Sequence, residues 1–449
     1  MRVFTAALLT VLLAYTPLAS AQTENVTLDQ ARQVALERNL NVVQADANVN
    51  AAQAGVLSAY GGYLPSLSAS GGWTRTQIDR AVSGTAALGG GSFNIPAVRN
   101  TSNSFSTSLG LNWTVFDGFG RQGQVGQASS RSISTEQTAT RTRQAIVYQV
   151  ESTYLNVLRN EQLVLVSDEN LKRDQRQLER ITESNRVGAL SLADVYRQQS
   201  QVGSDEYQLI QAQNNFNKSK ADLAALIGLD LNKEYTFIDP SISTDIPKAE
   251  LDSTATRYTN FPELVRRAIA ARPDYQGAVE SYNAASSGVT MARSGYFPSL
   301  NVFAGYGLSS DELSSLKDNN SLDWGLRLQW TLFDGFGTNA NVQSAVANRR
   351  IAEITVAQTE RDIGAEVKKA LLDLEAARKQ YEVSQSALIS ATEDRKIAEE
   401  RYNLGAGTLL DLLTANANLV SAQANLVNSA YGYFTAKRNI EYTLGERTY

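Results

Sequence analysis

The octapeptide WTVFDGFG at residues 113–120 recurs as WTLFDGFG at residues 330–337, with only Val115 replaced by Leu332. Three further landmarks recur in the same order: YLPSL (63–67) as YFPSL (296–300), VGALSLADV (187–195) as LGAGTLLDL (404–412), and LIG (226–228) as TLG (443–445). Self-similarity at one long period indicates an internal duplication. The sequence therefore predicts two copies of one structural plan, repeat 1 over residues 22–230 and repeat 2 over residues 261–449, joined by a polar linker over residues 231–260.

Residues 1–21 have the features of a secretory signal peptide. Arg2 is followed by an apolar stretch from Val3 to Tyr15, and the small residues Ala19-Ser20-Ala21 offer a cleavage site. The apolar stretch is shorter than the roughly 20 residues that a membrane-spanning helix needs. We therefore expect an exported protein whose mature chain begins at Gln22.

Two long proline-free regions, residues 97–239 and 299–449, allow unusually long helices. In repeat 2, apolar and small residues recur at alternating spacings of four and three, which is typical of closely packed antiparallel helices. The members of this seam are Ile363, Val367, Ala370, Leu374, Ala377, Tyr381, Ser384, Leu388 and Ala391, then Leu412, Ala415, Leu419, Ala422, Leu426, Ser429, Tyr433, Ala436 and Ile440. The pattern predicts a long helical hairpin in each repeat, with tips at about 187–191 and 404–408.

Each repeat also contains a segment in which apolar and polar residues alternate, over residues 105–115 and 322–332. Period two predicts a strand with one apolar and one polar face, and about 11 residues suffice for a tilted strand to cross a bilayer. A weaker partner strand follows each YxPSL motif. We therefore predict one β-hairpin at about 63–116 and another at about 296–333, with the connections 77–103 and 309–321 as exposed loops.

An amphipathic hairpin usually covers a soluble core, but this chain is expected to be exported and its helices already face one another. No segment after residue 21 has 18 consecutive apolar residues, so strands would have to make any membrane crossing. Four strands cannot close a barrel, so subunits would have to share strands. Two copies would give eight strands and three would give twelve, and the count alone does not decide between them.

The composition excludes several kinds of function. The chain has no Cys and no His, which rules out disulfides, Ser-His-Asp triads and His-ligated metal sites. A formal net charge of −5 argues against a nucleic-acid partner. The GFG and GGG stretches complete no phosphate-binding fingerprint. We therefore predict no catalytic residues, no metal and no cofactor.

The export signal, the duplicated plan, the W-T-[VL]-F-D-G-F-G motif and the [VL]-G-A-x-[ST]-L-x-D tips resemble the TolC family of outer-membrane efflux proteins over essentially the whole mature chain. The resemblance implies a mixed α/β membrane protein in the outer membrane of a Gram-negative bacterium. It implies a homotrimer with a shared twelve-stranded barrel in lipid and a periplasmic tunnel of long antiparallel helices. It also implies two partners, a periplasmic adaptor (membrane fusion) protein and an inner-membrane pump of the RND, ABC or a similar class.

The resemblance also gives roles to residues at the tips. Val187-Gly188-Ala189-Leu190 and Leu404-Gly405-Ala406-Gly407 match the adaptor-docking turns of the family, although plain hairpin turns use the same glycines. Asp194 and Asp411 match acidic residues of the constriction, and Tyr402 matches a gate tyrosine. The residues alone offer another explanation for both aspartates, as the third residues of capping boxes that begin at Ser191 and Thr408.

The gate pattern of the family is incomplete in this sequence. Gly407 stands where the best-studied members have an arginine, and Thr414 stands where they have a second ring aspartate. The sequence therefore leaves open whether a closed-state latch forms, and whether Asp194 and Asp411 are gate residues or only helix caps.

The repeated WTxFDGFG motif is predicted to be the junction between barrel and tunnel. Its aromatic residues would end a strand and its Asp-Gly pair would supply a turn into a long helix. The residues concerned are Trp113, Phe116, Asp117 and Gly118 in repeat 1 and Trp330, Phe333, Asp334 and Gly335 in repeat 2. Aromatic residues at strand ends, with Trp73 and Trp324, also fit the girdles of membrane barrels.

We therefore interpret the chain as the outer-membrane channel-tunnel of a tripartite efflux or type I secretion system, a passive duct and not an enzyme. The alternative is a secreted or surface coiled-coil protein, such as a stalk or adhesin. A carboxylate-based hydrolase would require a paired acidic cleft that no motif here supplies. The exported substrate is not encoded in any of these motifs.

Overall fold

The computed structural model describes residues 24–80, 85–88, 91–94, 98–239 and 242–446. The predicted signal peptide, residues 1–21, lies outside the described residues. The chain divides into two compact units. The helical unit comprises Met1–Val43, Thr142–Ala271 and Ala365–Tyr449, and the sheet unit comprises Gln44–Arg141 and Arg272–Gly364.

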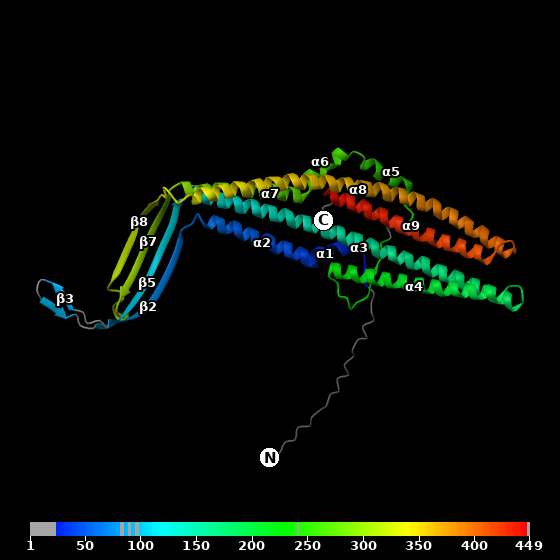
Figure 1. Cartoon of the computed structure of the whole chain (residues 1–449), viewed down its shortest axis with the longest axis horizontal. Coiled ribbons are helices and arrows are strands. Elements are labelled where there is room, and N and C mark those ends of the chain that lie inside the picture. Colours follow the sequence, from blue (N-terminus) through cyan, green and yellow to red (C-terminus); the bar gives the residue numbers. More distant parts are fainter. Residues whose placement is uncertain (1–23, 81–84, 89–90, 95–97, 240–241, 447–449) are drawn as a thin grey trace, which may run out of the picture. The chain divides into compact units, whose positions relative to one another are not determined.

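The sheet unit contains a four-stranded antiparallel sheet in the order β2-β5-β7-β8, whose strands lie side by side in Figure 1. The strands are β2 (Ser66–Arg80), β5 (Val98–Phe116), β7 (Ser299–Ser310) and β8 (Asn320–Gln329). Within each repeat the two strands form a hairpin, and pairing of β5 with β7 joins the hairpins. A small hairpin of β3 (Thr85–Leu88) and β4 (Gly91–Asn94) lies between β2 and β5 in the chain.

Strand lengths differ from the prediction in two places. β2 and β5 pair as far as Arg80 and Val98, so much of the predicted loop 77–103 is strand. At the other end, β8 stops at Gln329, so the prediction that Trp330 and Phe333 belong to the strand is wrong. The two strands end differently because their neighbours do. β5 continues to Phe116 because β7 pairs with it that far. Within the described sheet β8 pairs only with β7, which begins opposite Gln329, so β8 has no strand to pair with beyond that residue.

The two faces of the sheet have opposite character, as the period-two pattern predicts. On the polar face, hydroxyl groups bond across the strands, with 2.8 Å between the Oγ atoms of Ser70 and Ser108. The large apolar side chains of the other face are exposed: Leu67, Trp73, Leu109, Trp113, Tyr306, Leu322, Trp324, Leu326 and Leu328. The described residues of the sheet unit therefore leave an apolar face uncovered.

Two helices of 67 residues each, α3 (Gly120–Arg186) and α8 (Gly337–Asn403), run from the sheet unit into the helical unit. The sheet unit also holds most of α2 (Leu40–Gly61), with α7 (Pro273–Arg293) and the short helices η1 (Ser294–Tyr296) and η2 (Leu313–Ser315). The helical unit adds β1 (Glu24–Val26), α1 (Leu28–Arg38), α4 (Leu192–Ile227), β6 (Tyr235–Phe237), α5 (Lys248–Arg257), α6 (Phe261–Ala271) and α9 (Leu409–Thr443).

Among the helices of the described ranges, none has a stretch both long and apolar enough to span a membrane.

The predicted seam of apolar and small residues is the buried stripe of the long helices. Val367, Ala370 and Tyr381 on α8 are almost completely buried, as are Tyr433 and Ile440 on α9. The hydroxyl of Tyr381 donates to the carbonyl of Thr244 and accepts from the backbone N–H of Ile246, at 3.1 and 2.9 Å. A heptad-like seam thus correctly identified the packed faces of this hairpin.

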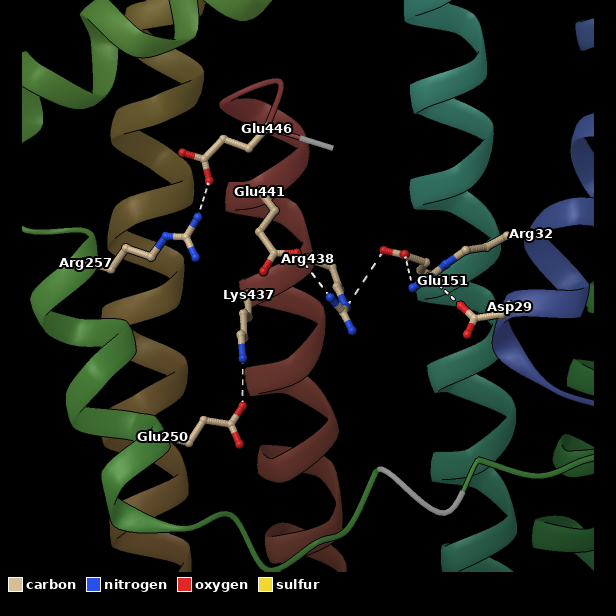
Figure 2. A network of polar contacts seen from close by, with 9 residues as sticks. All are labelled: Asp29, Arg32, Glu151, Glu250, Arg257, Lys437, Arg438, Glu441 and Glu446. Carbon is tan, nitrogen blue, oxygen red and sulfur yellow. Dashed lines mark hydrogen bonds and ion pairs between the residues drawn. The ribbon is translucent and has the colours of Figure 1, made fainter. Parts of the chain in front are cut away.

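An ion-pair network ties α1, α3, α5 and α9 together in the helical unit (Figure 2). The carboxylate of Glu151 on α3 is 1% exposed and lies 2.5 Å from the guanidinium of Arg32 on α1. Arg438 of α9 reaches the same carboxylate at 3.9 Å and also binds Glu441 at 3.2 Å. A buried carboxylate needs such cationic partners, so the network fixes the relative position of these helices.

Candidate functional site: the tips of the helical hairpins

Both helical hairpins turn through a left-handed glycine. α3 and α8 end at Arg186 and Asn403, and Gly188 and Gly405 then adopt φ values of +79° and +71°. One residue later, the N–H of Ala189 donates to the carbonyl of Ser184 at 2.8 Å, and repeat 2 has the equivalent bond from Ala406 to Arg401. These bonds close the last helical turn in the manner of a Schellman motif, which requires the glycine conformation.

The turns present small and apolar residues to the outside. Val187 is 72% exposed and Leu404 is 82% exposed. A Cβ atom added to Gly188 or Gly405 would meet nothing within 4 Å. Glycine is therefore required at these two positions by the positive φ angle, and not by close packing within the subunit. The space beside them is open to another molecule.

The predicted capping box is confirmed for Asp411, whereas the box at Asp194 is only half formed. Thr408 and Asp411 form a complete capping box: the N–H of Asp411 donates to the Thr408 hydroxyl at 3.2 Å, and Asp411 Oδ2 accepts from the Thr408 N–H at 2.9 Å. At the other tip the Ser191 hydroxyl accepts from the N–H of Asp194 at 3.2 Å. Asp194 Oδ2 accepts from the same hydroxyl at 2.7 Å, and not from the backbone N–H of Ser191. Each aspartate thus contributes to the N-terminus of the helix that follows the tip.

The electrostatic surroundings of the two aspartates differ. The backbone N–H and hydroxyl of Thr408 lower the pKa of the Asp411 carboxyl, with a smaller effect from Arg401. Asp411 is thus a fully exposed carboxylate that stays ionised near neutral pH. Asp194 is only partly exposed and has Arg197 at 3.4 Å.

Of the three predicted gate residues, Tyr402 and Asp194 lie close to each other. Neither of them contacts Asp411. Burial raises the pKa of the Tyr402 hydroxyl, the charge of Asp194 raises it further, and Arg180 opposes them. Tyr402 lines a cavity of about 650 Å³ between the two hairpins, shared with Gln177, Arg180 and Leu190. The cavity joins the tip of repeat 1 to that of repeat 2.

A polar chain that sequence reasoning missed links α3, α8 and α9 just above the tips. Arg180 of α3 lies 3.6 Å from Glu399 of α8, which binds Arg395 at 2.7 Å. Arg395 donates to Asn416 Oδ1 of α9 at 3.2 Å, and Asn416 donates to Asp174 Oδ1 at 3.4 Å. The sequence feature that could have indicated this chain of contacts is Asn416, a polar residue next to Ala415 of the apolar seam.

The chain of contacts ends at a pair of buried carboxyl groups, also missed. Asp174 is 1% exposed and Asp205 is 2% exposed. Burial, followed by a hydrogen bond to Asp174 and the charge of Asp174, raises the pKa of Asp205 to about 7. Gln201 donates to Asp205 Oδ1 at 3.0 Å, and Gln198 donates to the backbone carbonyl of Asp174 at 3.1 Å. The Asp205 carboxyl is therefore partly protonated near neutral pH.

The WTxFDGFG segments form matching local structures. Trp113 Nε1 donates to the Tyr63 carbonyl at 2.9 Å, and Trp330 Nε1 donates to the Tyr296 carbonyl at 3.2 Å. In both segments the Asp-Gly-Phe turn has two consecutive left-handed residues, and Phe119 and Phe336 are the two non-glycine residues with positive φ in the described chain.

The aspartate of each motif has a role that sequence reasoning did not foresee. Asp117 Oδ2 accepts from the N–H of Arg121 at 2.9 Å, and Asp334 Oδ2 accepts from the N–H of Thr338 at 2.6 Å. Each carboxylate therefore satisfies a backbone donor in the first turn of a long helix, besides belonging to the turn.

Within the described ranges, no group of three or more Asp and Glu side chains is arranged to hold a metal ion. The site consists of exposed tips, capping carboxylates and helix-linking charges.

The sequence profile of the family described as "Outer membrane efflux protein" matches residues 31–229 and 264–446. Among curated relatives, the probable efflux pump outer membrane protein TtgC of Pseudomonas putida is 26% identical over 426 residues, which cover 93% of this chain and 82% of TtgC. Outer membrane protein TolC of Escherichia coli is 22% identical over 356 residues, which cover 77% of this chain and 70% of TolC.

Two solved structures have the same fold. The outer membrane channel CmeC of Campylobacter jejuni superposes with a TM-score of 0.75 at 20% identity, over 93% of this chain and 85% of CmeC. The outer membrane protein VceC of Vibrio cholerae gives a TM-score of 0.76 at 20% identity, over 93% of this chain and 96% of VceC.

The long helical hairpins, the amphipathic sheet and the fold shared with these channels define an outer-membrane channel of the efflux class. Because the profile match covers most of the chain, the chain belongs to the outer membrane efflux protein family. It is an efflux channel of the outer membrane that extends into the periplasm.

Proposed function

We propose that the chain works as a homotrimer, forming a passive export duct from the periplasm to the outside. Each subunit contributes its four strands to a twelve-stranded barrel in the outer membrane and its two long helical hairpins to a periplasmic tunnel. A periplasmic adaptor docks at the tips, and an inner-membrane pump of the RND, ABC or a similar class supplies the substrate. We assign the duct no catalytic reaction.

The observation that carries this proposal is an open, amphipathic sheet. β2 and β8 are its outer strands, and within the described chain neither has a partner on its outer side. In lipid each unpaired backbone group costs several kcal/mol, so the edges require strands from other subunits. Three copies supply twelve strands and leave a pore, whereas an eight-stranded barrel is filled by its own side chains. An efflux duct needs the pore.

The tips supply the proposed docking and gating surfaces. Exposed Val187 and Leu404, beside the open space at Gly188 and Gly405, form a shallow apolar surface suited to an adaptor. Asp411 is an exposed carboxylate that would be repeated in each subunit around the mouth of the tunnel. Asp194 and Tyr402 act with it at the constriction.

Because Gly407 stands where the family has a gate arginine, the closed state needs another contact between the two hairpins. The contact between Arg180 and Glu399 joins the two hairpins of a subunit next to Tyr402. We infer that this ion pair, and not a Tyr402–arginine–aspartate latch, holds the hairpins together at the mouth.

The organisation of the chain follows from the same proposal. Residues 1–21 direct export and are removed, repeat 1 occupies residues 22–230 and repeat 2 residues 261–449, and the WTxFDGFG segments are the barrel–tunnel junctions. The relative TtgC is named as a probable efflux pump outer membrane protein, and OpmQ of Pseudomonas aeruginosa is named as a pyoverdine export outer membrane protein. We infer that this chain serves a pump in the same way, and that a surface stalk or adhesin is the less favoured function.

Two measurements on the purified full chain test the proposal. Native mass spectrometry in detergent is expected to give three subunits, and insertion into planar lipid bilayers is expected to give ion conductance. A monomer, or a dimer without conductance, would refute the shared twelve-stranded barrel.

A further inference from the structure

We propose that the wall of the duct carries a binding site for exported molecules that have an aromatic body and a carboxylate group, in the cavity beside Arg159. Residues of α3, α8 and α9 line this cavity, which has a volume of about 500 Å³. The inference rests on the proposed duct, to which it adds a class of substrate and the residue that recognises it.

Arg159 of α3 is a partly buried cation without an ion-pair partner in the described chain. Its Nη2 atom donates to the amide oxygen of Asn156, whereas its Nε atom is shielded from solvent and has no hydrogen-bond partner. Burial lowers the pKa of the guanidinium, and no carboxylate of the described residues offsets that effect. A desolvated cation of this kind is stabilised by an anion that enters the cavity.

The floor of the cavity includes a glycine inside a long helix. Gly432 lies within α9 and is not among the residues with positive φ, and a Cβ atom added to it would meet nothing within 4 Å. Glycine inside a helix costs about 1 kcal/mol relative to alanine. Neither the backbone angle nor packing within the subunit requires that cost. Together with Ala436 one turn later, the glycine keeps the space beside Arg159 open.

The other lining groups suit an aromatic carboxylate. The ring of Tyr148 on α3 is stacked on that of Tyr442 on α9, with centroids 4.9 Å apart and planes at 9°, which fixes an aromatic ring in the wall. Leu155 adds apolar surface and Asn439 adds an amide. Pockets for small molecules combine apolar walls with a few polar groups in this way, and a guanidinium is well suited to bind a carboxylate.

One carboxylate also lines the cavity. Asp373 of α8 is exposed to solvent, so water and salt screen its charge, whereas Arg159 is partly desolvated. The cation therefore dominates beside the hydrogen-bonding groups of α3. The exposed Asp373 disfavours ligands that carry a second negative charge.

The cavity opens on the side of α9 that the shorter elements leave free. Lys437 of α9 binds Glu250 of α5 at 2.7 Å, and Arg438 reaches Glu151 on another side, where α1 also packs (Figure 2). At about 100° per residue, Gly432 lies opposite the midpoint between Lys437 and Arg438. A duct has to keep short elements out of its lumen, so α1 and α5 cover the outside and the cavity faces the lumen.

All of the lining comes from one chain, so each subunit carries one complete site. A site in a transport path must bind weakly enough to release its ligand again. The site therefore favours the entry of aromatic carboxylates into the duct and does not retain them.

The probe for this site is naphthoate, and naphthamide is its uncharged control of the same shape. Isothermal titration calorimetry of the full-length protein in lipid nanodiscs is expected to show stronger binding of naphthoate. Arg159→Gln is expected to weaken naphthoate binding at least about ten-fold, because a hydrogen bond to a charged group is lost, and Arg159→Lys is expected to lose less. Lys172→Gln is the matched control, since it removes an exposed cation of α3 that does not line the cavity.

A second pair of variants changes the space and keeps the charge. Gly432→Leu fills the cavity and is expected to abolish naphthoate binding, whereas Gly432→Ala adds one methyl group in open space and is expected to retain it. In planar bilayers, naphthoate is expected to reduce the conductance of the unaltered channel, and to reduce that of Arg159→Gln much less.

Equal binding of naphthoate and naphthamide, or unchanged naphthoate binding by Arg159→Gln, would overturn the site. Absence of naphthoate binding in a protein that is oligomeric and conducts ions would overturn the site and leave the proposed duct standing. A protein that binds naphthoate through Arg159 but forms no conducting channel would refute the duct, and with it the role of the site in export.

Discussion

The carboxyl group of Asp205 on α4 lies beside that of Asp174 on α3, although both side chains are almost completely buried. Asp174 is bound in turn by Asn416 of α9. One ionisable pair thus lies where the first hairpin meets the second. Cations of α3 and α8, Arg173 and Arg395, belong to the same cluster of charges.

The stability of this region should therefore fall as the pH rises. The folded-state pKa of Asp205, about 7, exceeds its ordinary value of 3.8, so the folded chain binds a proton that the unfolded chain releases. The stabilisation is complete below pH 4 and is lost as the pH rises through 7, by at most about 1.4 kcal/mol per pH unit. Thermal unfolding followed by circular dichroism from pH 5 to pH 8 measures this slope.

The variant Asp205→Asn should flatten the pH dependence, because an amide can donate to Asp174 without titrating. Asp411→Asn is the matched control, since that carboxyl is exposed and its pKa is lowered, so the slope between pH 5 and pH 8 should persist. An unchanged slope in Asp205→Asn would show that another group titrates.

Much of the fold could be predicted from the spacing of apolar residues and from the repeated motifs. The alternation of Leu322, Trp324 and Leu326 identifies a strand, and the spacing of Val367, Ala370 and Tyr381 identifies a buried helix face. Both signals are local in the chain and depend only on which side of an element faces other atoms. The end of β8 was mispredicted because it depends on where a neighbouring strand begins, which no local pattern contains.

The site was predicted less completely, for a similar reason. The capping of Asp411 by Thr408 lies within four residues and could be predicted from sequence. Asp174 and Asp205 come from different helices, and each looks like an ordinary surface residue in its own window. Only the folded chain brings them together, so the raised pKa of Asp205 and the Arg180–Glu399 contact could not be foreseen.

If Asp411 contributes charge to the mouth of the duct, then Asp411→Ala should raise channel conductance and weaken block by divalent cations. The mutation also removes a helix cap, worth about 1 kcal/mol. Thr408→Ala is the matched control, because it disrupts the same capping box and keeps the charge. Planar-bilayer recordings with and without added Mg²⁺ separate the two effects, and equal block in both variants would reduce Asp411 to a helix cap.

The contact between Arg180 and Glu399 should favour the closed mouth modestly. The pair is partly exposed, and such pairs contribute about 0.2–1 kcal/mol, so Glu399→Gln should raise the open fraction by about 1.4- to five-fold. The charge-swapped double variant, Arg180→Glu with Glu399→Arg, should recover part of the closure. Arg395 complicates the swap, since it also binds Glu399, so Arg180→Gln and the double variant Arg180→Gln with Glu399→Gln complete the double-mutant cycle. Additive effects of the two single changes would show that the pair does not couple the hairpins.

The glycines of the tips should be needed for export more than for assembly. Gly405 has a φ of +71°, so Gly405→Leu combines backbone strain with bulk on the docking surface, whereas Gly405→Asn adds bulk with less strain because asparagine tolerates this conformation. If an adaptor docks there, both variants should lose most efflux of a fluorescent dye in cells that lack their own outer-membrane channel. Native gels should still show the intact oligomer. Normal efflux by Gly405→Asn would mean that the glycine serves only the turn, and loss of the oligomer in both variants would remove the support for a docking surface.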